Sequence, residues 1–308
     1  MAKINLYWFK HKKGKGNFGD ELNPYLIGKL SGKEINYVNI YYLNDDLFLV
    51  LKIITAALLN RHISFTEFAK YFFWNFIKSP KIILSIGSVL QWSKFKKFTI
   101  WGSGIIFSDA TFRNGNFTAV RGPYTQQRLK ELNYNVPETI GDPALLLPLI
   151  YTPKETSAYE IGIIPHFMHY DAIKEKCPEN VLVINLLDDI EDIIDQIASC
   201  NVTLSTSLHG IIVSHCYNVP SLWTTFIEVE NKLYGDDIKF KDYFSSVKLP
   251  EYQPMVIENI SDLHTFDISR LNDPDLKNCL VPDISDIKNI QKNLLRVAPF
   301  EILNKYRI

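Results

Sequence analysis

The chain has 308 residues, of which 46% are hydrophobic and 13% aromatic, with a formal net charge of −1. A chain of this length is longer than a domain with one hydrophobic core usually is, and it is about right for two α/β domains. The apolar content excludes a disordered chain, and a net charge close to zero does not indicate binding to nucleic acid. The four cysteines lie far apart without metal-ligand spacing, and the N-terminal sequence lacks the pattern of a signal peptide, so a reducing cytoplasm is expected.

Short apolar runs that are typical of strands alternate with helical patterns along the chain. The first strand is expected at 4–9, and a helix that opens with Asp20 and Glu21 follows a polar loop. Further apolar runs predict strands at 81–87, 98–104, 117–122, 160–166, 180–186, 201–205 and 219–225. This alternation predicts an α/β protein with parallel sheets and helices on both faces.

The middle of the chain contains the best candidate for a domain boundary. The segment 151–160 is polar, contains a proline and separates two series of alternating strands and helices. We therefore predict an N-terminal domain of residues 1–152 and a C-terminal domain of residues 153–308. The last helical pattern, 284–298, stops at Pro299 and is expected to pack back across the domains.

Two neighbouring segments are unusually apolar. The run LFLVLKIITAALL at 47–59 is interrupted only by Lys52, but it is shorter than the ~20 residues that span a bilayer. The aromatic-rich segment 65–78 follows, with lysines at intervals. We interpret it as a helix packed in or between domains, and the alternative is a patch that rests on a membrane surface.

Two histidines stand in the segment SLHGIIVSHCYNVPSLW, where a predicted strand leads into a helix. In doubly wound sheets, ligands collect at the carboxyl ends of strands, where helix N-termini present free backbone N–H groups. NVTLS predicts the strand, TSLHG its exit loop and IIVSHCY the helix, so His209 stands at the mouth of the sheet and Gly210 allows a tight turn. His215 falls inside the helix. We expect chemistry from His209 and a structural role for His215.

Three glycine-containing turns after predicted strands are suited to a ligand. In GNFGDELN, the glycines let the backbone approach a ligand and Asp20 is a candidate acceptor or base, while ordinary turn and cap chemistry explains the segment equally well. SIGSVL and IWGSGI suit an anion or a sugar but name neither. The candidate residues of these turns are Asn17, Gly19, Asp20, Gly87, Ser88, Gly102 and Ser103.

Two further strand ends carry an arginine and a histidine. Arg121 precedes Gly122 and Pro123, which open a helix, and a guanidinium beside a helix N-terminus suits phosphate or carboxylate. His166 ends a strand in the second half, with His169 three residues later. No third ligand follows at a suitable spacing, so we expect no metal site. These residues alone predict a two-domain α/β enzyme that binds an anionic small molecule in its cleft.

Eight segments follow one another between residues 3 and 246: GNFGDELNPYLIGKL, SIGSVL, WGSGI, VRGPYTQQRL, IGDPALLLP, GIIPH, TSLHGIIVSHCYNVPSLW and IKFKDYFSS. As an ordered set they resemble the polysaccharide pyruvyltransferase family. The resemblance implies a fold similar to GT-B glycosyltransferases, with two Rossmann-like domains and a cleft between them. It also implies that phosphoenolpyruvate gives its pyruvyl carbons to two sugar hydroxyls as a cyclic ketal and releases phosphate, without a metal or other cofactor.

The resemblance also implies roles for individual residues. His209, which precedes Gly210 in the family's His-Gly motif, is the candidate acid or base. Asp20 is our second catalytic candidate. Arg121 is the candidate clamp on phosphate or carboxylate, and His166 looks like an additional donor.

The chain departs from the family at one position of this motif. Some members carry arginine where this chain has Ser207, so Lys239 or Lys241 is expected to supply the missing cation to the donor pocket. On this interpretation residues 1–152 form the acceptor side and residues 153–308 the donor side.

Two other functions stay open. A GT-B-type glycosyltransferase that uses a nucleotide sugar fits the same two-domain cleft, although no acidic residue stands at a recognisable ribose-binding spacing. The other is an inactive protein that senses phosphoenolpyruvate or a glycan. For the transferase, the expected partner is a glycan acceptor, either free or linked to polyprenyl diphosphate. Contact with nucleic acid is not expected, and a cytoplasmic protein could also lie peripherally on the inner face of the membrane.

Overall fold

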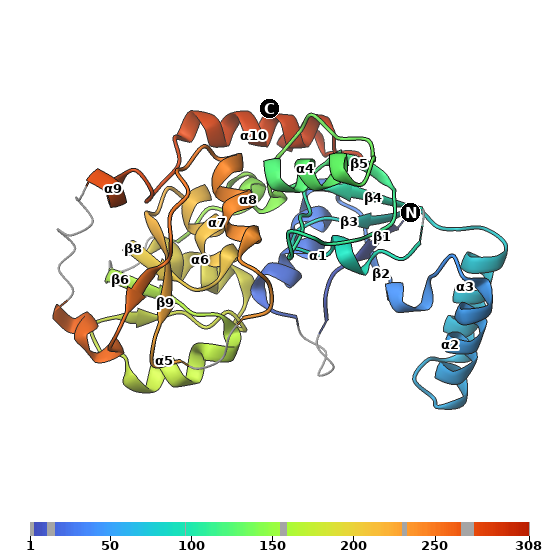
Figure 1. Ribbon diagram of the computed structural model, residues 1–308, viewed down its shortest axis with the longest axis horizontal. Coiled ribbons are helices and arrows are strands. Elements are labelled where there is room, and N and C mark those ends of the chain that lie inside the picture. Colours follow the sequence, from blue (N-terminus) through green and yellow to red (C-terminus); the bar gives the residue numbers. More distant parts are fainter. Residues whose placement is uncertain are drawn as a thin grey trace.

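The computed structural model describes residues 3–10, 16–95, 97–154, 159–229, 233–265 and 274–307. Two five-stranded sheets form the framework, with strand orders β2-β1-β3-β4-β5 and β10-β9-β8-β6-β7. Figure 1 shows the two sheets in separate halves of the molecule. Neighbouring strands in both sheets run parallel. The predicted α/β class with parallel sheets is therefore confirmed, while the domain division at residue 152 stays a prediction.

The first sheet and its helices come from the N-terminal half. Its strands are β1 (Ile4–Tyr7), β2 (Ile35–Tyr37), β3 (Ile82–Leu84), β4 (Phe98–Trp101) and β5 (Asn116–Ala119). Its helices are α1 (Phe18–Ser31), α2 (Leu47–Leu59), α3 (Phe65–Phe76) and α4 (Pro123–Glu131). A 3-10 helix, η3 (Pro143–Leu149), follows this half.

The second sheet comes from the C-terminal half. Its strands are β6 (Tyr159–Ile164), β7 (Leu182–Val183), β8 (Cys200–Ser205), β9 (Ser221–Phe226) and β10 (Met255–Ile257). The helices are α5 (Tyr170–Lys176), α6 (Ile190–Ala198), α7 (Leu208–Cys216), α8 (Ile238–Ser246), α9 (Pro274–Lys277) and α10 (Ile284–Arg296). The edge strands β2 and β10 were not expected, because three residues are too few to show an alternating pattern.

Helix α1 lies between the two halves and begins as its sequence predicts. The side chain of Asn17 caps it by accepting a hydrogen bond from the Asp20 backbone N–H at 3.2 Å, and Asp20 and Glu21 occupy the first turn. Its apolar residues are fully buried, among them Leu22 and Leu26. The first residue of the helix contacts the second half of the chain, where the Phe18 backbone N–H donates to the Leu186 carbonyl oxygen at 3.0 Å.

One hydrophobic core joins both halves. It contains Leu6 and Trp101 from the first sheet together with Ile193 and Ile211 from helices of the second. Helix α10 crosses back along one side of the molecule (Figure 1). There the Trp101 indole N–H donates to the Leu294 carbonyl oxygen at 3.0 Å. Contacts between the halves are therefore part of the core itself.

Helices α2 and α3 form a hairpin that projects from the body beyond β2 (Figure 1). Tyr71 is the buried residue of α3, whereas Phe48 on α2 is 82% exposed and Phe65 on α3 is 72% exposed. The expectation of a helix packed in or between domains is therefore wrong for the outer face of this hairpin. No helix in the described part of the chain is long and apolar enough to cross a membrane.

Candidate active site

A cavity of about 460 Å³ lies where strands of both sheets end. Its wall collects residues that follow β1, β3, β6 and β8 together with one residue of α8. The predicted site residues among those that line it are Asn17, Asp20, Gly87, Ser88, His166, Ser207, His209 and Lys239. Because ligands of parallel α/β sheets collect at carboxyl ends of strands, this cavity is the candidate active site.

His209 lies in the first turn of α7 rather than in the predicted exit loop, because the helix begins at Leu208. Its ring rests on the backbone of α1. A Cβ atom added at Gly19 would lie 2.1 Å from His209 Nδ1, so only glycine allows this close approach. Gly210 is helical too, and a Cβ there would lie 2.5 Å from Ser205 Oγ, so it serves close packing instead of a tight turn.

Asp142 is the charged partner of this histidine. The Asp142 carboxylate is buried, and its Oδ2 lies 3.7 Å from His209 Nε2. Within the described residues neither of these two atoms has a hydrogen bond, while Asp142 Oδ1 accepts from the Ala144 backbone N–H at 3.0 Å. A carboxylate at this distance is placed to orient the imidazole ring. Sequence reasoning missed Asp142, although it stands in the IGDPALLLP segment.

The Asp20 side chain faces the same cavity in an unusual state. It is 9% exposed, and its Oδ2 has no hydrogen bond within the described residues. Burial, with a smaller contribution from the charge of Glu21, raises its pKa from 3.8 to about 8. The N-terminus of the helix favours the ionised form by only about 0.3–1 kcal/mol, which is less than one pKa unit. The effect of burial on the pKa of Asp20 is therefore the larger one. Asp20 is therefore protonated at neutral pH and able to donate a proton.

Lys239 supplies a cation to the cavity. Burial, followed by the nearby charge of Arg121, lowers its pKa from 10.5 to about 8. Its Nζ lies 5.1 Å from the centre of the Phe240 ring, and no ion pair of Lys239 with an acidic side chain is present in the described part of the chain. A partly buried cation without an acidic partner favours a bound anion. Lys241, two positions further along α8, is not among the residues that line the cavity.

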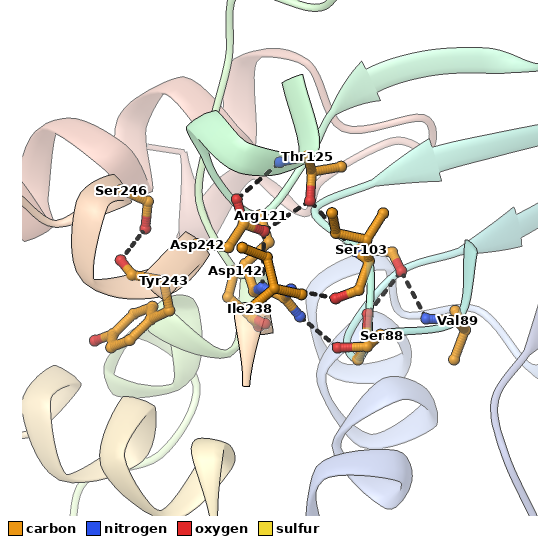
Figure 2. Close-up of polar contacts among 12 residues, drawn as sticks. Ser88, Val89, Ser103, Arg121, Thr125, Asp142, Ile238, Asp242, Tyr243 and Ser246 are labelled. Carbon is orange, nitrogen blue, oxygen red and sulfur yellow. Dashed lines mark hydrogen bonds and ion pairs between the residues drawn. The ribbon is translucent and has the colours of Figure 1, made fainter. Parts of the chain in front are cut away.

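Arg121 is buried behind the cavity wall, where three protein groups surround its guanidinium (Figure 2). Nε donates to Asp242 Oδ2 at 3.1 Å, Nη1 donates to Ser88 Oγ at 2.6 Å, and Nη2 donates to the Ile105 carbonyl oxygen at 2.7 Å. A direct clamp on a substrate anion would require this arrangement to open, so that role stays a prediction. Here Arg121 reaches the cavity through Ser88. Asp242, in the IKFKDYF segment, was missed by sequence reasoning.

The remaining predicted residues support the site from outside or at its edge. Ser103 is buried and donates from Oγ to the Gly87 carbonyl oxygen at 2.6 Å, which holds the turn after β3. Gly102 has a φ of +87°, and a Cβ there would collide with Pro143. The His166 backbone N–H donates to Thr206 Oγ1 at 2.7 Å. Among the described residues, no group of three or more His, Cys, Asp or Glu side chains could hold a metal ion.

The fold and the cavity define an α/β protein with a candidate active site at the carboxyl ends of parallel strands. A family model described as polysaccharide pyruvyl transferase matches residues 17–225, which include Asp20, Asp142 and His209. The chain therefore belongs to the polysaccharide pyruvyl transferase family, as its motifs predicted.

One curated relative shows how far the similarity extends. An uncharacterized protein of Acanthamoeba polyphaga mimivirus is 36% identical over 172 residues, which cover 52% of this chain and 58% of that protein. The match thus spans less than two thirds of the relative's own length. No solved structure matches the chain.

Proposed function

We propose that this chain transfers the pyruvyl group of phosphoenolpyruvate to two hydroxyls of one sugar in a polysaccharide or in its lipid-linked precursor. The product is a cyclic ketal, and phosphate is released. The observation that carries the proposal is the meeting of a protonated carboxyl, an imidazole beside a carboxylate and a partly buried lysine in one cavity, contributed by Asp20, His209 and Lys239.

The donor carries two anionic groups, and the cavity offers positive potential from two sources. Lys239 is the cation that lines it, and the N-caps of α1 and α7, Asn17 and Ser207, line it as well. Helix N-termini direct free N–H groups and a partial positive charge toward an anion. This combination supports binding of the phosphate and carboxylate of phosphoenolpyruvate without an arginine at position 207.

The proposed reaction needs one proton donor and one proton acceptor. Protonation of the methylene carbon turns it into a methyl group and creates an oxocarbenium-like centre that a sugar hydroxyl attacks. We assign the donated proton to Asp20, which is protonated at neutral pH, and the hydroxyl proton to His209, whose Nε2 lies 3.7 Å from the Asp142 carboxylate. A second hydroxyl then attacks the same carbon, the bond between this carbon and the phosphate oxygen breaks, and the proton of the second hydroxyl leaves with the phosphate. The proton that His209 took up returns to Asp20 before the next turnover. These steps use protein groups and the donor substrate alone.

The arrangement of the chain around the cavity supports a GT-B-like organisation. Residues from both sides of position 152 line the cavity, and each side contributes a parallel sheet. In the proposal, residues 153–308 carry Lys239 and hold the donor, while residues 1–152 face the acceptor. A cytoplasmic protein of this kind would meet the donor where phosphoenolpyruvate is made.

Phosphate release from phosphoenolpyruvate, measured across free and lipid-linked glycans, tests the proposal. Turnover should require a glycan and should leave a ketal on it that mass spectrometry detects. Lys239→Met should raise the KM for phosphoenolpyruvate strongly, because it removes the cation, whereas Lys241→Met serves as the matched control and should behave as wild type. Release of a nucleoside diphosphate from a nucleotide sugar, with no reaction of phosphoenolpyruvate, would instead show the glycosyltransferase. Binding of phosphoenolpyruvate with no turnover on any glycan would show a sensor.

A further inference from the structure

The α2–α3 hairpin, residues 47–81, concentrates exposed apolar side chains. Of the 19 large hydrophobic side chains that are exposed in the described part of the chain, ten lie between residues 47 and 77. Contiguous apolar patches are uncommon on a protein that stays free in water and mark an interaction surface. The exposed apolar side chains of the hairpin therefore indicate a surface that docks on a partner.

The hairpin is anchored, so its outer face has a defined orientation. Val50, Ile54 and Tyr71 on its inner side are buried in the core of the first half. The Tyr71 hydroxyl accepts a hydrogen bond from the Asn39 backbone N–H at 3.1 Å, and Asn75 Nδ2 donates to the Tyr42 carbonyl oxygen at 2.8 Å. The exposed face is thus the outer side of a folded element.

Aromatic rings run along α3 in one stack. The ring centres of Phe65 and Phe68 lie 6.4 Å apart, those of Phe68 and Phe72 lie 6.2 Å apart, and those of Phe72 and Phe76 lie 4.7 Å apart. The spacing of three and four residues keeps these rings on one side of the helix. On α2, Phe48 is the most exposed large apolar side chain of the described residues. Both helices of the hairpin therefore expose phenylalanine.

The charge of the hairpin selects among partners. Residues 47–81 contain five lysine and arginine residues and one glutamate, a net charge of +4, whereas the whole chain has −1. Lys52 on α2 and Arg61 in the turn are exposed, and Lys70 lies 4.7 Å from the ring centre of Tyr71. A second copy of the chain would bring two such positive surfaces together, which costs free energy. An anionic surface would instead be attracted.

We propose that the hairpin docks on an anionic lipid bilayer, with its phenylalanines in the interface and its cations at the headgroups. Helices of 13 and 12 residues, each about 20 Å long at ~1.5 Å per residue, suit an orientation along the surface. The proposal rests on the hairpin alone and holds whether or not the proposed function is correct.

Flotation of the full chain with vesicles tests the apolar part. The wild type should bind phosphatidylcholine vesicles that contain phosphatidylglycerol. Changing Phe48 and Phe65 to serine should lower the partition coefficient by about tenfold or more for each residue that inserts. Matched controls are Val256→Ser and Ile284→Ser, which change side chains that are 55% and 47% exposed elsewhere and should leave binding unchanged.

The contribution of the cations is tested in the same flotation experiment with the double variant Lys52→Gln and Arg61→Gln. A cation near an anionic surface contributes about fivefold to binding, so the pair should lower it by about 30-fold. Lys288→Gln with Lys292→Gln, two exposed residues of α10, is the control. These charge variants also test the proposal if the phenylalanine variants fail to fold.

Equal binding by hairpin and control variants, or no wild-type binding, overturns the proposal. A wild-type dimer that the phenylalanine variants dissociate, without vesicle binding, would show that a second copy covers the face.

Discussion

His209 and His215 stand on the same helix but meet different surroundings. His215 is buried, its Nδ1 lies 3.0 Å from the Tyr243 hydroxyl oxygen, and burial lowers its pKa to about 4. It is therefore neutral at physiological pH and part of the core. His209 faces the cavity with Asp142 behind it. The difference follows from which side of α7 each ring occupies.

We expect His209→Ala to lower turnover by about 10²–10⁴-fold, the usual contribution of a general acid or base, while its melting temperature stays near that of wild type. His215→Ala should lower the free energy of unfolding by about 1–3 kcal/mol, because a buried hydrogen-bonding partner is lost. Thermal melting and steady-state kinetics on both variants check this. Near-normal turnover in the His209 variant would remove it from the chemistry.

Asp20 makes stability depend on pH. Its native pKa of about 8 is above the ordinary value of 3.8, so between these values the native state keeps a proton that the unfolded state has lost. The contribution to the unfolding free energy therefore falls as pH rises through this window, by up to about 1.4 kcal/mol per pH unit. Asp20→Asn cannot ionise, so its stability relative to wild type should increase with pH.

Denaturant unfolding across this pH window measures that difference, with Glu21→Gln as the control for a neighbouring carboxylate of the same helix turn. Parallel pH profiles for wild type and Asp20→Asn would show that Asp20 is ionised in the native protein. The variant should also lose turnover, because an amide cannot protonate a carbon atom. In the wild type, turnover should fall as pH rises above about 8, the pKa of this acid.

At the scale of elements, one carboxylate ties α8 to α4. Asp242 on α8 accepts from Arg121 Nε, from the Thr125 backbone N–H at 3.0 Å and from Thr125 Oγ1 at 2.7 Å (Figure 2). It thereby neutralises a buried arginine and caps the N-terminus of α4. Since α8 also carries Lys239, this contact sets where the cavity's cation lies.

We expect Asp242→Ala to lower the free energy of unfolding by about 3–5 kcal/mol, because it leaves the Arg121 guanidinium buried without its counter-charge. Glu131→Gln is the comparison, since Glu131 pairs with Arg128 at the surface at 2.9 Å, and exposed pairs of this kind contribute little to the free energy of unfolding. Chemical denaturation measures both. An equally small effect for the two variants would mean that Arg121 finds other acceptors when Asp242 is absent.

At the scale of the whole molecule, the core makes the two sheets depend on each other. Leu294 on α10 is fully buried in the core that both halves share, and its carbonyl oxygen accepts from Trp101 of the first sheet. Gln291 Nε2 on the same helix donates to the Leu145 carbonyl oxygen at 2.7 Å. Because the two halves share this core, we expect them to unfold together and not one after the other.

Scanning calorimetry should therefore show one main unfolding transition. Leu294→Ala should lower its midpoint as a whole, with a loss of about 2–5 kcal/mol, the usual cost of truncating a buried leucine. Val297→Ala, a change at the less buried end of the same helix, should cost less. Two transitions, of which the variant shifts one, would show that the halves unfold independently.

The local pattern of the sequence predicted much of the framework. Strands such as β6 and β8 are apolar runs between helical segments, and their type can be recognised from a few adjacent residues. The start of α7 was misplaced because Gly210 was interpreted as part of a tight turn, whereas Ser207 is the N-cap and the helix begins at Leu208. The hairpin was misjudged because an aromatic helix has the same composition whether its rings are buried or exposed.

By itself, the sequence determined the α/β class, the parallel sheets, the family and eight of the eighteen residues that line the cavity, because these depend on short periodic patterns and ordered motifs. Only the tertiary structure decided that Asp142 faces His209, that Asp242 neutralises Arg121, and that Asp20 is buried enough to hold its proton. The physical reason is that pairing and burial of charges depend on which distant segments meet. Asp242 and Arg121 are separated by 121 positions, and no local pattern records such a contact.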